Sequence, residues 1–93
     1  MSIATNILEQ ITKLAALFLP PDRIARIIEM DAEEFKQALI DPNSEIYRAY
    51  YTGYDRADVE FRESVIKIAK QGSQPAQDQV KKYISELKPK LNE

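Results

Sequence analysis

The sequence contains no cysteine and no histidine, and each absence removes a class of chemistry. Without cysteine there is neither a disulfide framework nor a thiolate metal site, and a reducing compartment permits such a composition. Without histidine, the commonest general base, the Ser-His and Cys-His nucleophile pairs and nearly every zinc site are missing as well. We therefore expect a protein that is not an enzyme and that uses no metal and no cofactor.

Long apolar runs are also missing. The longest strongly apolar run, LAALFL at 14–19, is far shorter than the roughly 20 residues that cross a bilayer, and no basic region precedes the first apolar stretch. The sequence predicts no membrane partner and a cytoplasmic location.

Basic charge is scarce, especially early in the chain. The formal net charge is −2 over 93 residues, whereas neutralising phosphates favours a surplus of Lys and Arg in a general nucleic-acid binder. Residues 1–41 hold four bases against seven acids, a balance of −3, and residues 42–93 hold nine bases against eight acids, a balance of +1. A chain of this size has room for one small domain with little stability to spare.

The apolar spacing predicts three short helices at the N-terminus. Within residues 3–18, apolar residues recur at spacings of three and four residues. This spacing indicates an amphipathic helix with Ser2 or Asn6 as its cap. Pro20 and Pro21 stop this helix and open a second one at about 21–29, which is expected to bury Ile24, Ala25, Ile27 and Ile28. Asp31 and Glu34 have the spacing of a capping box and start a third helix, which DPNS at 41–44 ends.

Two longer helices are expected after this segment. An apolar stripe from Ile46 to Ile68 predicts one long helix from Glu45 to about Gln71. Gly72 is placed to end it in a left-handed conformation, and a last helix at 74–88 is expected to end at Pro89. The predicted fold class is all-α, with a helix-turn-helix three-helix head at 1–41 followed by an antiparallel hairpin of long helices at 44–88, in one compact unit overall.

Residues 20–41, PPDRIARIIEMDAEEFKQALID, have the spacing of a helix-turn-helix, although Glu29 stands where the turn commonly has glycine. The residues expected at its exposed surface are the DNA-binding candidates, Arg23, Arg26, Glu33, Lys36 and Gln37. The arginines would contact phosphates, and Lys36 and Gln37 would face base edges, whereas Glu33 would repel phosphate. A solvated surface explains the same residues equally well, because acid at a helix start also favours the helix dipole.

Four tyrosines in YRAYYTGY at 47–54 form the second candidate site. Single-stranded nucleic acid could stack on such rings, but tyrosine is also favoured at protein interfaces, and Gly53 with Ala57 offers a notch for close helix approach. We expect a homo-oligomer whose interface uses Tyr47, Tyr50, Tyr51, Gly53, Tyr54 and Ala57.

The stretch AYYTGYDRADVEFRESVIKIAKQGSQPAQ resembles the helix that follows the helix-turn-helix in small terminase subunits of tailed phages. The residues that carry the resemblance are Tyr50, Gly53, Arg62, Val65, Ile66, Ala69, Gly72, Ser73 and Ala76. With the helix-turn-helix in front, the similarity covers roughly residues 20–84.

The resemblance implies a DNA-packaging protein that binds double-stranded phage or prophage DNA through its helix-turn-helix. It also implies an oligomer built by the later helices and a large terminase subunit as a further partner. The alternative is a non-catalytic helical module for protein–protein interaction that shares this topology and binds no DNA.

Overall fold

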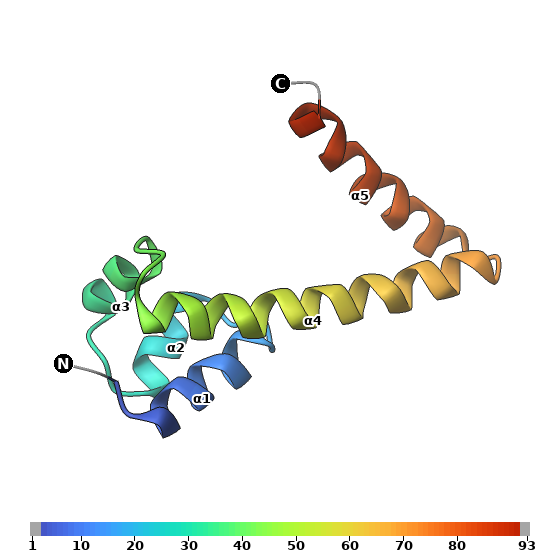
Figure 1. Ribbon diagram of the computed structural model, residues 1–93. Coiled ribbons are helices and arrows are strands. Elements are labelled where there is room, and N and C mark those ends of the chain that lie inside the picture. The colour runs from blue at the N-terminus through green and yellow to red at the C-terminus, as the bar shows by residue number, and fades with distance from the viewer. Residues whose placement is uncertain (1–2, 92–93) are drawn as a thin grey trace. The chain divides into compact units, whose positions relative to one another are not determined.

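The computed structural model describes the backbone of residues 3–91 and the side chains of residues 3–87. Over these residues the chain forms five α-helices, which confirms the all-α prediction (Figure 1). They are α1 (Thr5–Ala15), α2 (Pro21–Ile27), α3 (Ala32–Leu39), α4 (Glu45–Lys70) and α5 (Gln74–Leu91).

The chain divides into two compact units, Met1–Asp58 and Val59–Glu93, and the division lies within α4. We call the first unit the head and the second the hairpin. The head therefore includes the first half of α4 and is longer than the predicted 1–41 segment. Whether residues 1–41 or 44–88 act as separate functional parts stays a prediction.

The ends of α1 differ from those expected. Its N-cap is Ala4, with no side-chain hydrogen bond, so the expected cap at Asn6 is wrong, and Ser2 lies outside the described residues. The helix ends at Ala15, and Phe18 then takes a left-handed conformation with φ 60°. The chain turns here before the prolines, which explains why α1 is shorter than the apolar run predicts.

The starts of α3 and α4 follow the sequence signals. The backbone N–H of Glu34 donates to Oδ2 of Asp31 at 3.0 Å, as the capping box predicts. Ser44 accepts at its Oγ from the backbone N–H of Ile46 at 3.1 Å and from that of Tyr47 at 3.4 Å. Each polar side chain thus satisfies N–H groups that the first turn of a helix leaves unpaired.

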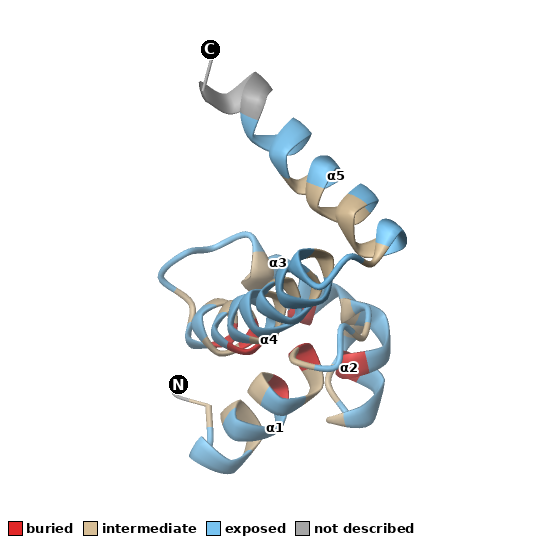
Figure 2. Cartoon of the chain, turned by 90° about the vertical axis from the view of Figure 1, so that its right-hand side faces the viewer, coloured by how far each residue is buried: buried red, intermediate tan, exposed pale blue. Residues whose placement is uncertain are grey.

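All the buried apolar side chains among the described residues lie in the head (Figure 2). They come from α1 to α4 and form one cluster, Ile11, Ala15, Ile24, Ala25, Phe35, Ile46 and Tyr50. Ile27 was expected to be buried as well, but 46% of its surface is exposed. The residues of α2 that are buried in the core are Ile24 and Ala25.

Gly53 marks the closest approach of two helices in the head. A Cβ built on Gly53 would collide with the carbonyl oxygen of Thr12 in α1 and would lie 2.8 Å from its carbonyl carbon. The hydroxyl of the same threonine donates to the carbonyl oxygen of Ala49 at 3.0 Å. The missing side chain of Gly53 therefore lets the backbones of α1 and α4 meet within one chain.

The turn of the hairpin has the predicted geometry. Gly72 has a φ of +103°, which confirms its left-handed conformation, and its backbone N–H donates to the carbonyl oxygen of Ala69 at 3.0 Å. Ser73 precedes α5 and accepts from the backbone N–H of Ala76 at 3.4 Å. Nε2 of Gln77 donates back to the carbonyl oxygen of Ala69 at 3.1 Å, so α5 starts beside the end of α4 and runs antiparallel to it.

The hairpin has few contacts between its helices beyond the turn. The guanidinium of Arg62 lies 4.1 Å from the ring centroid of Tyr83 and 3.6 Å from a carboxylate oxygen of Glu86. The helix α5 continues to Leu91, past Pro89, where its end was expected. This proline lies near the end of the helix, where its missing N–H removes a single donor.

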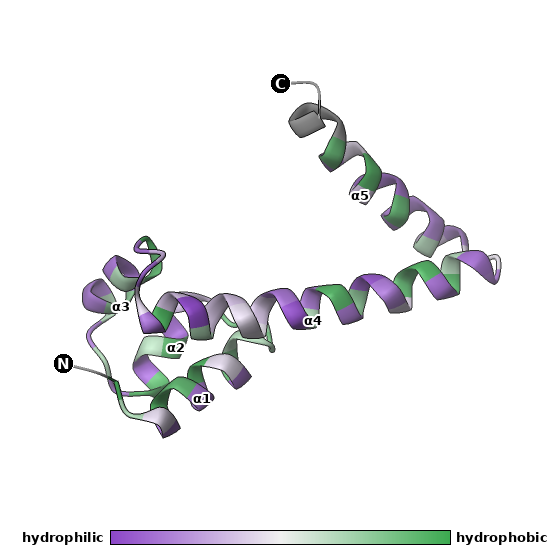
Figure 3. Cartoon of the chain, viewed as in Figure 1, coloured by the Kyte–Doolittle hydropathy of each residue, from purple (hydrophilic) through white to green (hydrophobic). Residues whose placement is uncertain are grey.

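None of the hairpin side chains that the structure describes is buried. Figure 3 shows apolar positions recurring along the second half of α4 and along α5. In the described part of the chain, no helix has the length and apolar character needed to cross a membrane.

Candidate nucleic-acid interface

The turn between α2 and α3 has the backbone conformation that a helix-turn-helix needs. Glu29 takes a φ of 59°, the left-handed region in which such turns commonly place glycine. The backbone N–H of Met30 then donates to the carbonyl oxygen of Ala25 at 2.8 Å, which closes the end of α2. The turn is therefore formed without glycine, at the cost of local strain in Glu29.

Buried side chains on both helices hold α2 and α3 together. Ile24 and Ala25 of α2 and Phe35 of α3 are 0–1% exposed. Phe35 also meets the ring of Tyr50 edge-on, with centroids 6.5 Å apart. The angle between the two short helices is thus fixed by the core of the head.

The five predicted DNA-binding side chains are all exposed. Arg23 and Arg26 lie on α2, and Glu33, Lys36 and Gln37 lie on α3. The first turn of α3 also carries Glu34, so the helix end that would approach DNA is acidic. Acid there is favourable for the helix dipole but repels phosphate.

Lys36 has a partner that the sequence analysis missed. Its Nζ lies 2.9 Å from a carboxylate oxygen of Asp22 at the start of α2. This hydrogen bond and the charge of Asp22 raise the pKa of Lys36 above its ordinary value, and the charge of Glu33 adds to the effect. The two residues are fourteen positions apart, beyond the i to i+4 spacing by which a helix pairs charges, so no local pattern indicates the pair.

The tyrosines of α4 pack mainly on one another and on the head. Tyr50 stacks on Tyr54 with ring centroids 6.2 Å apart, and Tyr47 lies 4.6 Å from Tyr51. The ring of Phe18 meets Tyr54 edge-on at 5.5 Å. These faces are occupied within the chain, which reduces what a nucleobase could stack on.

Tyr50 and Gly53 do not fit the predicted oligomer interface, because the chain itself buries both. Tyr50 is 9% exposed in the core cluster, and Gly53 lies against the backbone of Thr12. Burial raises the pKa of Tyr50, and the neighbouring Tyr51 and Tyr54 raise it further. Sequence reasoning missed Thr12 as the contact of Gly53, because the spacing of small residues does not say which helix will meet them.

The other four members of the set remain a prediction. Tyr47, Tyr51 and Ala57 are partly buried, and Tyr54 is 38% exposed. Part of the surface of each of these four residues is therefore accessible to a second chain.

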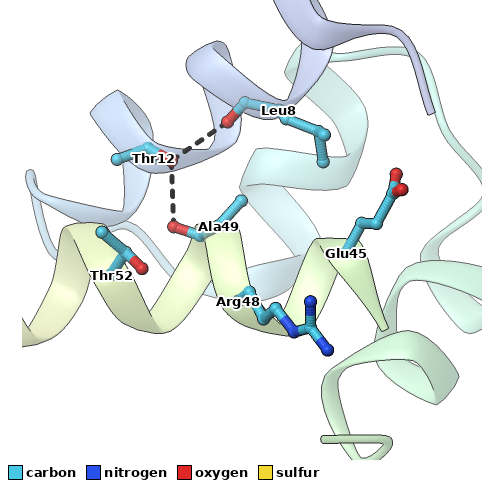
Figure 4. A pocket seen from close by; sticks show the side chains of 6 residues that line it. All are labelled: Leu8, Thr12, Glu45, Arg48, Ala49 and Thr52. Atoms are coloured by element: carbon cyan, nitrogen blue, oxygen red, sulfur yellow. Dashed lines mark hydrogen bonds between the residues drawn. The ribbon is translucent and has the colours of Figure 1, made fainter. Parts of the chain in front are cut away.

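A groove of about 360 Å³ runs along the contact between α1 and α4 (Figure 4). Leu8 and Ala49 form its apolar part, and Glu45 and Arg48 lie at its polar end. The hydroxyl of Thr12 is already satisfied by the carbonyl oxygens of Leu8 and Ala49. The polar side chains that line the groove besides Thr12 are those of Glu45, Arg48 and Thr52.

Comparison of the chain with family models, with curated protein sequences and with solved structures finds no match. The resemblance to small terminase subunits rests on the residues of this chain alone.

Proposed function

We propose that the protein is a non-catalytic DNA-binding adaptor that resembles a small terminase subunit. It recognises double-stranded phage or prophage DNA in the host cytoplasm and presents it for packaging. The observation that carries the proposal is the α2–α3 turn, where Glu29 takes the conformation that glycine commonly supplies in a helix-turn-helix.

Binding by a single head is weak, since few cations are available to phosphates. Arg23, Arg26 and Lys36 are exposed, and phosphate competes with Asp22 for Lys36, whose Nζ lies 2.9 Å from the Asp22 carboxylate. Each phosphate neutralised contributes roughly one unit to the log-log salt slope, so a head with two or three contacts has a shallow slope and low affinity. In an oligomer, the binding of one head raises the effective concentration of the other heads near the same DNA, and this avidity supplies the remaining affinity. A large terminase subunit is the partner that would receive the DNA.

The test is a titration of fluorescent duplexes with the oligomer at low and moderate salt. Arg23→Ala with Arg26→Ala is expected to weaken binding to every sequence alike, by about tenfold or more, because phosphate contacts carry no sequence information. Gln37→Ala is expected to change which duplex is preferred, because a side chain at a base edge specifies sequence.

Lys67→Ala with Lys82→Ala is the matched control. It removes the same charge from exposed positions in the hairpin, far along the chain from α2 and α3. The control is expected to bind as the parent does. The proposal is wrong if the parent oligomer retains no duplex at low salt, or if the arginine variant binds as well as the parent.

A protein–protein module is the second candidate, and the acidic start of α3 favours it. Glu33 and Glu34 are exposed there, and Asp22 competes for the nearest lysine. Such a surface suits a basic protein partner better than phosphate. Failure of DNA binding together with intact self-association would favour this function.

A further inference from the structure

We propose that the groove between α4 and α5 binds an amphipathic helix of another protein, one that carries carboxylates on both sides of an apolar row. The floor of this groove is apolar, and two lysines flank the end of it that lies nearer the hairpin turn. The floor residues are Ile66, Val80, Ile84 and Leu87, and the flanking residues are Lys70 and Lys81. The inference concerns the hairpin alone and rests neither on DNA binding nor on self-association.

The groove is open and has the length of two helical turns. It consists of two adjoining hollows of about 350 and 420 Å³, both of which are lined by Ile66 and Val80. Ile84 is 51% exposed and Leu87 is 55% exposed, so the described chain leaves much of the floor uncovered. Val80, Ile84 and Leu87 are spaced by four and three residues and form a row of roughly 10 Å. A floor of this length accepts the side chains at i, i+4 and i+7 of one partner helix.

The hollow nearer the hairpin turn has a basic rim. Lys70 lines it from α4 and Lys81 lines it from α5, and both side chains are exposed. The other residues that line this hollow are apolar or uncharged. Within the described part of the chain, neither lysine has an ion pair. Uncompensated positive charge therefore lies on both sides of the apolar floor, where it complements carboxylates on both sides of an apolar row.

The hollow farther from the turn has balanced charges. Arg62 of α4 and Glu86 of α5 both line it, and Nη2 of Arg62 lies 3.6 Å from a carboxylate oxygen of Glu86. The guanidinium also lies 4.1 Å from the ring centroid of Tyr83. This difference in charge between the two hollows orients the partner helix. Its carboxylates lie near the turn, and its apolar row continues over Ile84 and Leu87.

Shape and charge together favour a protein helix over other anionic partners. The apolar side chains line a hollow, which fits the convex row of a helix better than the plane of a bilayer. Nucleic acid would offer phosphates to the lysines but no apolar row for an aliphatic floor. It stacks on aromatic rings instead, and the ring that lines the groove, that of Tyr83, already has Arg62 over it.

The experiment measures the binding of three labelled synthetic peptides to the full chain by fluorescence anisotropy. Each peptide is alanine-rich and about 15 residues long, so that it can form a helix. The acidic peptide has a row of leucines at i, i+4 and i+7 with glutamates on both sides. The basic peptide has lysine in place of each glutamate, and the third peptide has serine in place of each leucine. The parent is expected to bind the acidic peptide with a Kd of roughly 10–100 μM, and the other two at least about tenfold more weakly.

Reversing the charge of the rim tests the role of the lysines. Lys70→Glu with Lys81→Glu is expected to weaken binding of the acidic peptide by about tenfold or more, because attraction becomes repulsion. The same variant is expected to bind the basic peptide more tightly than the parent does, and this gain shows that its groove is still folded.

Lys67→Glu with Lys82→Glu is the matched control for the charge reversal. It makes the same change of charge on the same two helices, at exposed positions that line neither hollow. At an ionic strength of about 0.15 M, where distant charges are screened, it is expected to bind the acidic peptide within about threefold of the parent.

Ile84→Ser tests the apolar floor. It shortens a side chain that lines the groove, and it is expected to weaken binding of the acidic peptide by about fivefold. Far-UV circular dichroism is expected to show the helicity of the parent, since Ile84 is exposed and lies outside the core cluster.

The inference is overturned if the parent binds the acidic peptide no more tightly than the basic one, or if the charge-reversed chain binds the acidic peptide as well as the parent does. Binding of the parent to vesicles of anionic phospholipid, without binding of the acidic peptide, would assign the groove to a membrane surface and overturn it. An oligomer that Ile84→Ser dissociates would assign the groove to a second copy and also overturn it. A parent that binds the acidic peptide but no DNA leaves the inference standing and removes the DNA-binding proposal, and a parent that binds DNA but not the peptide does the reverse.

Discussion

The head and the hairpin are built from the same kind of amphipathic helix, but they differ in how far their apolar side chains are buried. Among the described residues, the head buries seven apolar side chains from four helices and the hairpin buries none. The helix α4 belongs to both: its stripe is buried at Ile46 and Tyr50 and exposed at Phe61 and Ile68. Apolar periodicity therefore predicts that a face will be covered, but not whether the same chain covers it.

The largest expected difference comes from removing one phenylalanine from each unit. Phe35→Ala empties a fully buried site and is expected to lower the free energy of unfolding of the head by about 3–5 kcal/mol. Phe61→Ala is expected to change the head by less than about 0.5 kcal/mol, because its side chain is 53% exposed in the hairpin. Urea denaturation followed by near-UV circular dichroism, at concentrations below self-association, measures both.

Equal losses in these two variants would show that the head and the hairpin unfold as one cooperative unit with a shared core. Loss of stability in Phe61→Ala alone would contradict the assignment of the core to the head.

Replacing each of the two glycines by alanine gives a second, smaller comparison, since Gly53 lies in the head and Gly72 lies in the hairpin. Gly53→Ala is expected to cost about 3 kcal/mol in the head, because the new Cβ meets the backbone of Thr12, which cannot rotate away. Alanine is otherwise the better helix former by about 1 kcal/mol, so without this contact the substitution would stabilise α4. Thermal denaturation followed by near-UV circular dichroism gives the sign.

Gly72→Ala is the matched variant in the hairpin. Nothing lies within 4 Å of its new Cβ, so the expected cost of about 1–2 kcal/mol comes only from the φ of +103°. It is expected to reduce helicity in far-UV circular dichroism and to leave the head transition unchanged. A Gly53→Ala variant as stable as the parent would contradict the close approach of α1 and α4.

Local signals in the sequence predicted much of this architecture. The side-chain cap at Asp31, the left-handed Gly72 and the order of five helices are properties of neighbouring residues, and each is confirmed. Periodicity also placed Ile24, Ala25 and Phe35 in the core correctly.

Partners distant in the sequence were not predictable in the same way. The contact of Gly53 with Thr12 and the ion pair of Lys36 with Asp22 depend on how helices cross, which the spacing of residues does not encode. The candidate DNA surface was thus predicted as a set of exposed side chains, but the ion pair of Lys36 with Asp22 on that surface was not. Tyr50 was assigned to an oligomer for the same reason, because its covering helices lie earlier in the chain.

The smallest expected effect concerns Glu29, and it tests whether strain in the head is local to the α2–α3 turn. Its φ of 59° is unfavourable for a residue with a Cβ by roughly 1–2 kcal/mol, and glycine takes this conformation freely. Glycine also loses more chain entropy on folding, so Glu29→Gly is expected to raise the free energy of unfolding by a net of about 0.5–1 kcal/mol. Glu29→Gln keeps the Cβ and removes only the charge of an exposed side chain, so its stability is expected to match the parent in the same urea titration.

If the glutamine variant gains as much stability as the glycine variant, charge repulsion explains the effect, and the turn is not strained. If neither variant gains, the conformation of Glu29 costs little, and the α2–α3 turn forms without glycine at no cost in stability.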